Sequence, residues 1–230
     1  MIEEKLLHFR LGGQTEATEL DFPAQRIICA GYSGRSQDAV QEHVRELVAH
    51  GMPAPDSTPI FFPVSNYLAT TGSVVTVQDP CTSGEVEFVL LFHQGQTYVT
   101  CGSDHTHREL ERYSIPGAKQ MHPKILATDV WRFEDVRPNW DRIMLRSWAT
   151  VKGKRELYQE ASLAHILAPE PLIEEAERRY KVRTDGTIFM SGTIPTVGGH
   201  LVFAEYFAFE MHDPVSSRTI RHAYEVSLLQ

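Results

Sequence analysis

The feature that most constrains the fold is a series of short apolar runs that recurs from one end of the chain to the other. The runs are rich in β-branched and aromatic residues and are bounded by Gly, Pro, Asp and Ser, a pattern typical of strands and hairpins. Two tight polar turns that contain glycine, at 93–96 and 152–155, predict hairpins. The runs lie at 6–11, 26–32, 59–64, 73–77, 87–92, 97–101, 124–133, 142–151, 187–193, 201–211 and 219–229.

Helical periodicity is confined to three segments, 36–49, 105–113 and 170–181. The first carries an apolar stripe at i, i+4, i+7 and i+8, formed by Val40, Val44, Leu47 and Val48. The second fits a capping box made by Thr106 and Glu109. The third has a proline near its first turn, and its acidic residues precede its basic ones. With so few helices among so many strands, we expect an α+β protein that is mainly β, with the helices packed on one side or end.

The composition limits the class of protein. A chain of 230 residues is long enough for one sizeable core, and we expect one domain, with or without an N-terminal extension. The formal net charge of −8 argues against nucleic acid as a partner. No run approaches the roughly 20 apolar residues that span a bilayer, and the amino terminus lacks the pattern of a signal peptide, so we expect a cytoplasmic protein without a membrane partner.

The three cysteines, Cys29, Cys81 and Cys101, form no CxxC pair. An odd number without paired spacing suggests neither a disulfide framework nor a thiolate zinc site. We expect them to be small core residues.

Two acidic residues, Glu85 and Glu87, stand at the start of the run 87–92. Because side chains alternate along a strand, both point to the same face. They are either the solvated face of an antiparallel strand or two oxygen ligands of a hard cation. Asp104 offers a third carboxylate, or caps the helix expected at 105–113.

Other segments also carry residues of chemical interest. His43 and Glu46 lie three positions apart on the first expected helix, where they form either an orienting pair or an ordinary surface pair. Lys119 lies in a stretch with Gly and Pro, expected to be a loop before a strand, where it meets an anionic ligand or solvent. His105 and His107 raise the alternative of a zinc site, but on a helix they would lie about 200° apart.

Taken in order, these segments resemble the fumarylacetoacetate hydrolase superfamily from about residue 26 to the end of the chain. The resemblance rests on six stretches: RIICAGYSG, HVREL, PIFFPVSNY, GEVEFVLLF, SDHTHRELE and SGTIPTVGG. It implies a mixed β-sandwich roll with a few peripheral helices. It also implies an N-terminal strand extension at 1–25 and a catalytic domain at 26–230.

The resemblance assigns roles to individual residues. It implies that Glu85, Glu87 and Asp104 hold Mg²⁺ or Mn²⁺, with Ca²⁺ a further candidate, and that His43 and Glu46 form a water-activating dyad. The remaining implied residues act on the substrate, Lys119 as a catalytic residue and the others as contacts: Arg108, Glu111, Gly192 and Thr193. The sequence departs from the family pattern in a short spacing from Glu87 to Asp104, a longer approach to His43, Glu111 in place of the usual Gln, and Ile194 between Thr193 and Pro195.

The activity that this resemblance implies is that of a divalent-metal-dependent hydrolase or lyase. Its substrate would be a small oxo acid, an acylpyruvate or an oxaloacetate-like compound, whose C–C bond breaks through an enolate stabilised by the cation. An isomerase of the same family, or a metabolite-binding protein that keeps the fold without turnover, is the alternative. The family resemblance also implies a homodimer.

Overall fold

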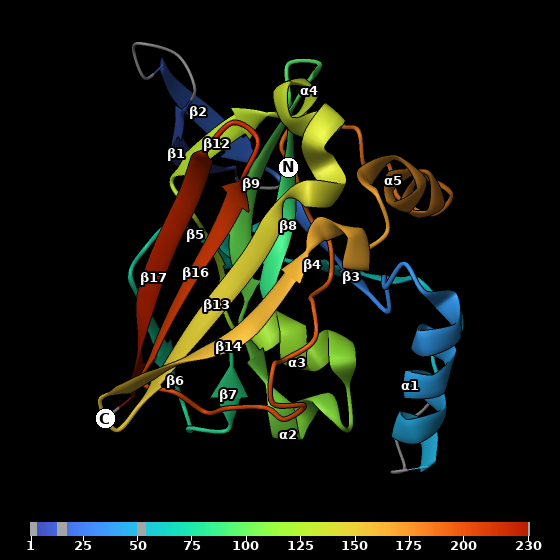
Figure 1. The fold of residues 1–230 in the computed structure, drawn as a ribbon, viewed down its shortest axis with the longest axis vertical. Helices are drawn as coiled ribbons and strands as arrows, with labels where there is room; N and C mark the ends of the chain where they lie inside the picture. Colours follow the sequence, from blue (N-terminus) through green and yellow to red (C-terminus); the bar gives the residue numbers. More distant parts are fainter. Residues whose placement is uncertain (1–3, 13–17, 50–53, 230) are drawn as a thin grey trace.

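A computed structural model of the chain describes residues 4–12, 18–49 and 54–229. Over these residues the chain forms two large sheets and a few short helices, which confirms the mainly β α+β fold (Figure 1). The larger sheet runs in the order β2-β1-β12-β9-β8-β15-β3-β4, with β11 and β5 joined to the end of β9. Its strands are β1 (Lys5–Leu11), β2 (Thr18–Ala24), β3 (Arg26–Gly31), β4 (Ile60–Val64), β5 (Ala69–Thr70), β8 (Val86–His93), β9 (Gln96–Asp104), β11 (Lys124–Leu126), β12 (Asp129–Arg132) and β15 (Thr187–Met190).

The second sheet runs in the order β14-β13-β16-β17-β6, and a short pair, β7 with β10, stands beside it. Both large sheets are mixed, since β1, β3 and β17 each have a parallel neighbour. The strands are β6 (Val74–Val77), β7 (Thr82–Ser83), β10 (Thr106–His107), β13 (Met144–Val151), β14 (Lys154–Ser162), β16 (Tyr206–Asp213) and β17 (Arg218–Leu228).

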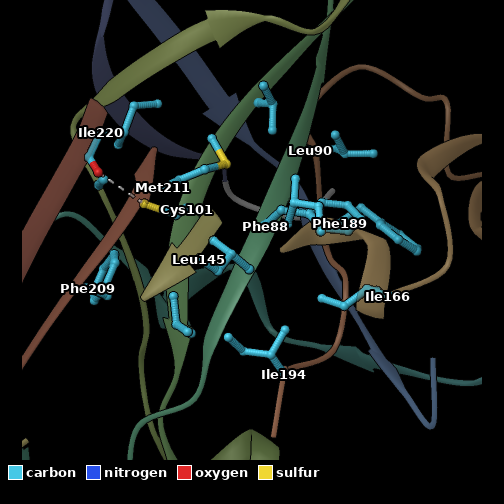
Figure 2. Close-up of a cluster of buried hydrophobic side chains, with 14 of the residues drawn as sticks. Phe88, Leu90, Cys101, Leu145, Ile166, Phe189, Ile194, Phe209, Met211 and Ile220 are labelled. Atoms are coloured by element: carbon cyan, nitrogen blue, oxygen red, sulfur yellow. Dashed lines mark hydrogen bonds between the residues drawn. The ribbon is translucent and has the colours of Figure 1, made fainter. Parts of the chain in front are cut away.

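The core fills the space between the two sheets. Figure 2 shows Phe88 of the large sheet beside Leu145 of the second sheet, and both belong to one buried cluster with Leu90 and Phe209. A second apolar cluster covers the other face of the large sheet and includes side chains of its first two strands, the N-terminal hairpin β1–β2. Strand β8 is therefore buried on both faces, which is why its run of apolar residues is continuous rather than alternating.

Both predicted hairpins are confirmed. The turn between β8 and β9 places Gln94 and Gly95 at φ of 49° and 70°, and the turn between β13 and β14 places Lys152 and Gly153 at 50° and 75°. Two successive residues with positive φ are the signature of a type I′ turn, which matches the twist of the strands that it joins. Glycine at the second position adopts this conformation without steric cost.

The helices are short and peripheral: α1 (Gln37–Ala49), α2 (Arg108–Glu111), α3 (Ile115–Met121), α4 (Phe133–Val136) and α5 (Pro169–Glu177), with 3₁₀ turns at Asn66–Leu68, Arg137–Arg142 and Leu163–His165. Figure 1 shows α2 and α3 together at one end of the sheets and α1 set apart at the side. None of the helices within the described ranges is long and apolar enough to cross a membrane.

The structure corrects three details of the helices. The second begins at Arg108 instead of residue 105, because Thr106 and His107 pair with β7, so the proposed capping box does not form. The third ends at Glu177, short of residue 181. On α1, which forms as expected, the apolar stripe is only partly covered, since Val40 is buried but Val48 is 44% exposed.

Candidate metal centre

Three carboxylates meet where the β8–β9 hairpin opens. Glu85 directly precedes β8, Glu87 lies within it, and Asp104 ends β9. The antiparallel register sets Glu87 opposite Gly102, and the Asp104 N–H donates to the Glu85 carbonyl at 3.0 Å. As a result, one carboxylate oxygen from each acid lies within 4.8 Å of the other two. The short connection between Glu87 and Asp104 is what brings these side chains to the same end of the hairpin.

Glu87 is the most unusual of the three acids. Its side chain is fully buried, which excludes a solvated strand face for this residue. Oε2 accepts a hydrogen bond from the Gly192 N–H at 2.9 Å, whereas Oε1 is buried without a hydrogen-bond partner among the described residues. Burial, and next the negative charge of Asp104, raise the pKa of Glu87 well above its usual value.

Asp104 is held by two buried lysines. Lys124 donates from Nζ to Oδ1 at 2.6 Å, and Lys119 donates to Oδ2. Burial alone would raise the pKa of Asp104, but the two ammonium groups outweigh it and hold the pKa well below its ordinary value. Asp104 is therefore a carboxylate whose charge is fixed, not the cap of the neighbouring helix.

Arg108 neutralises the outer side of the site. Its guanidinium pairs with Glu85 at 3.1 Å and with Glu111 at 2.8 Å, and its Nε donates to Ser83 at 2.7 Å. Of the three clustered acids, Glu87 is thus the one for which the described part of the chain supplies no ion pair. The unbalanced negative charge is concentrated on the buried side chain at the centre.

The lysines show where the sequence was misleading. Lys119 was expected in a loop, but it lies in the last turn of α3, which carries it over Asp104. Lys124 was missed, although a lysine that opens the apolar run KIL and is fully buried is an unusual residue for a core strand. Lysine at such a position requires a partner, and only the fold shows that the partner is Asp104.

A loop after β15 closes one side of the site. Gly192 adopts a φ of +81°, and a side chain there would lie 2.3 Å from the Ser33 hydroxyl, so the position requires glycine. Thr193 donates from Oγ1 to the Val86 carbonyl at 2.8 Å and accepts from Gln159 at 2.8 Å. Gly192 and Thr193, both expected to contact substrate, are thus bonded directly to the strand that carries the acids.

The two residues of the predicted dyad fall on helix α1. His43 and Glu46 occupy positions on α1, but their side chains lie outside the described residues. Figure 1 shows α1 separated from the α2–α3 pair that supplies Arg108 and Lys119. The assignment of this dyad stays a prediction.

The two histidines of the zinc alternative make other bonds. His105 Nδ1 lies 3.0 Å from the Tyr224 hydroxyl, and His107 Nε2 lies 2.7 Å from Asp79. Both rings face His122, but the described part of the chain gathers no three histidine, cysteine or acidic ligands other than the three carboxylates. Burial lowers the pKa of His105 to about 3 and that of His122 to about 4, so both stay neutral in the core.

The residues present fit a hard divalent cation. All three donors are carboxylate oxygens, which Mg²⁺, Mn²⁺ and Ca²⁺ prefer over nitrogen or sulfur. They lie close enough to converge on one ion, and the Glu87 Oε1 atom is a buried acceptor without a donor. A cation at this point would offset the charge that the neighbouring basic residues leave on Glu87.

The comparisons with known proteins agree with this fold. A family model described as "Protein of unknown function (DUF2848)" matches residues 30–224, which is most of the chain. The chain belongs to this family. No curated protein matches the sequence of this DUF2848 protein closely enough to count as a relative.

Solved structures confirm the resemblance of this DUF2848 protein to the fumarylacetoacetate hydrolase superfamily at the level of the fold. A putative fumarylacetoacetate hydrolase family protein from Yersinia pestis CO92 has a TM-score of 0.59 and 16% identity, with 93% of this chain and 96% of that chain covered. A 5-carboxymethyl-2-hydroxymuconate delta-isomerase from Mycobacterium smegmatis has a TM-score of 0.59 and 15% identity, with 97% of this chain and 94% of that chain covered. A 2-keto-3-deoxy-D-arabinonate dehydratase complexed with magnesium and 2,5-dioxopentanoate has a TM-score of 0.61 and 15% identity, with 95% of this chain and 78% of that chain covered.

Proposed function

We propose that this protein binds Mg²⁺ or Mn²⁺ through Glu85, Glu87 and Asp104 and acts as a hydrolase or lyase on a C–C bond of a small oxo acid. The observation that carries the proposal is the buried Glu87, which lies within 4.8 Å of two further carboxylates and has no basic partner in the described part of the chain. A buried, unpaired carboxylate is costly, and a bound cation is one way in which a protein stabilises it.

The basic residues around the acids would set the charge of the site. Arg108 and Lys119 offset the charge of the acids and of an anionic substrate, and Lys124 holds Asp104 in place. A divalent cation bound here would act as a Lewis acid toward the oxygen atoms of an oxo acid. His43, oriented by Glu46, would move the proton, either from a water molecule or to the substrate carbon.

The relatives by fold support the proposal and also define its alternative. One is a dehydratase whose structure contains magnesium and 2,5-dioxopentanoate, and another is an isomerase. The same site in this chain would thus also suit an isomerase, or a protein that binds a metabolite without turnover. The homodimer is part of the proposal as well, and sedimentation of the purified protein tests it.

Metal binding tests the first half of the proposal. Titration of the metal-free protein with Mn²⁺, followed by electron paramagnetic resonance, should show one site per chain that Glu87→Gln abolishes. The matched control is Glu111→Gln, which removes a nearby acid that is paired with Arg108 and should leave the site intact. Binding that survives Glu87→Gln places the ion elsewhere and refutes the assignment.

A panel of acylpyruvates and oxaloacetate, assayed with the metal present, tests the second half. Product formation supports the hydrolase or lyase, and binding without product supports the metabolite-binding alternative. His43→Ala should abolish turnover but leave the affinity for Mn²⁺ nearly unchanged. Full activity of that variant would contradict the role of the dyad.

A further inference from the structure

A buried glutamine connects the second sheet to the candidate metal centre. Gln159 lies in β14 and is 1% exposed. Its Oε1 accepts from the Val86 N–H at 2.9 Å and from the Ser147 hydroxyl at 2.9 Å. Its Nε2 donates to Thr193 Oγ1 at 2.8 Å and to the Ile194 carbonyl at 2.7 Å. The carboxamide thus uses both donors and both acceptor sites.

The partner on the strand side is the backbone between two of the acids. Val86 separates Glu85 from Glu87, and its N–H is the donor that Gln159 satisfies. A hydrogen bond to this N–H fixes the orientation of the peptide plane. That orientation sets the directions in which the neighbouring side chains leave the backbone. Gln159 therefore acts on the direction in which both carboxylates leave the strand, without touching either of them.

The partner on the loop side closes a ring of hydrogen bonds. Thr193 accepts from Gln159 and donates to the Val86 carbonyl, so the three residues are bonded in a cycle. The adjoining Gly192 N–H donates to the Glu87 carboxylate at 2.9 Å. The loop is also anchored by Ile194, whose side chain is 1% exposed and lies in the core (Figure 2).

We propose that Gln159 is a positioning residue for the metal centre: it locks the 85–87 segment and the 192–194 loop in one arrangement, and cation affinity depends on it. This inference rests on the proposed function. Neither glutamate nor methionine makes the same bonds at this position, because a glutamate would face the Ile194 carbonyl with an oxygen, and a methionine would leave the Val86 N–H and that carbonyl without partners. Groups that orient metal ligands commonly change metal affinity 10- to 100-fold when they are removed.

The test is the Mn²⁺ dissociation constant of Gln159→Met, measured by electron paramagnetic resonance at a temperature well below unfolding. We expect binding about 10- to 100-fold weaker than in the native protein. Gln159→Asn, one methylene shorter and unable to reach both sides, should weaken binding about tenfold or more. It serves as the test if the methionine variant does not fold.

The matched control is Thr100→Val. Thr100 is buried in β9 and donates to the Asp129 carbonyl at 2.7 Å, so the variant also loses a buried hydrogen bond, but away from the acids. Its Mn²⁺ affinity should stay within about twofold of native, since stability alone does not set the affinity of the folded site. Native-like affinity in both Gln159 variants, or an equal loss in Thr100→Val, overturns the inference. Absence of Mn²⁺ binding by the native protein overturns the proposed function, and the inference with it.

Discussion

Replacement of Glu87 by glutamine should make the metal-free protein more stable than the native protein and remove the stabilisation that the cation provides. Glutamine has the same shape, and its amide oxygen can still accept from the Gly192 N–H. Its amide nitrogen would take the place of the buried Oε1, on a side chain that lies close to the carboxylates of Glu85 and Asp104, which are acceptors. At a pH above the raised pKa of Glu87, the variant thus lacks a buried charge and has a donor where the ionised side chain has none.

The size of the change in unfolding free energy differs between the metal-free and the metal-loaded protein. Without metal, loss of an uncompensated buried charge should raise the unfolding free energy by about 1–3 kcal/mol. With the cation at 100 times its dissociation constant, the unfolding free energy of the native protein rises by about 2.7 kcal/mol. The variant lacks this increase. The variant should therefore be the more stable protein in chelator, and should lose most or all of that advantage in saturating Mg²⁺.

The pH dependence has a defined sign. Burial, and then the charge of Asp104, raise the pKa of Glu87 in the folded protein above its value in the unfolded chain. Without metal, the native protein should lose stability as the pH rises from about 4.5 toward the raised pKa, because ionisation favours the unfolded chain. The advantage of Glu87→Gln should grow over the same interval and then level off.

Urea unfolding of both proteins, in chelator and in Mg²⁺ at pH 5 and pH 8, measures the unfolding free energies that these predictions compare. Glu111→Gln is the control, since it removes an acid that is paired with Arg108 and should keep the metal-dependent gain. A Glu87→Gln variant that is less stable than native in chelator would show that Glu87 is not an unpaired charge. A variant that Mg²⁺ still stabilises as strongly would show that Glu87 is not a ligand.

Three other substitutions test the surroundings of the site. Lys124→Met should lower the unfolding free energy by about 3 kcal/mol, because it removes a buried partner of Asp104; a loss below about 1 kcal/mol in urea would contradict the pairing. Gly192→Ala should lower the unfolding free energy by clearly more than the roughly 1 kcal/mol expected for Gly95→Ala. Both glycines have positive φ, but only at Gly192 would the added methyl group meet another atom, at 2.3 Å. Equal losses in the two variants would refute the steric argument. Burial lowers the pKa of His122 to about 4, so the unfolded chain binds a proton at this residue at a higher pH than the folded protein does. The unfolding free energy should therefore fall as the pH drops from about 6.5 to 4, by at most about 1.4 kcal/mol per pH unit. If His122→Asn leaves the slope of unfolding free energy against pH unchanged in urea titrations, His122 is not the source of this dependence.

Local chemistry explains which parts of the fold were predictable. The two hairpins were found because glycine within a two-residue turn acts over a few bonds, regardless of the rest of the chain. The start of the second helix was wrong because the capping pattern at Thr106 competes with strand pairing, and Thr106 is instead held opposite Ser83 in β7. A pairing between segments more than 20 positions apart leaves no signal in a local pattern.

The candidate site was predictable only in part. Glu85, Glu87 and Asp104 were recognised from their order and from the alternation of side chains along a strand. Lys124 and Gln159 were not, since each is a polar residue in a strand and shows its role only through a partner on another element. The side chains of the proposed dyad lie outside the described residues, so that prediction stays open.

By itself, the sequence determined that two carboxylates share one face of a strand and that a short hairpin returns a third acid to their end. Those facts follow from the period of a strand and the length of a turn, which are properties of the local backbone. The tertiary structure alone decided that Asp104 is held by two lysines, that Glu87 is buried without a basic partner in the described part of the chain, and that Gln159 reaches across from the second sheet. These relations depend on how sheets and helices pack, because packing sets which distant residues share one buried volume and one electric field.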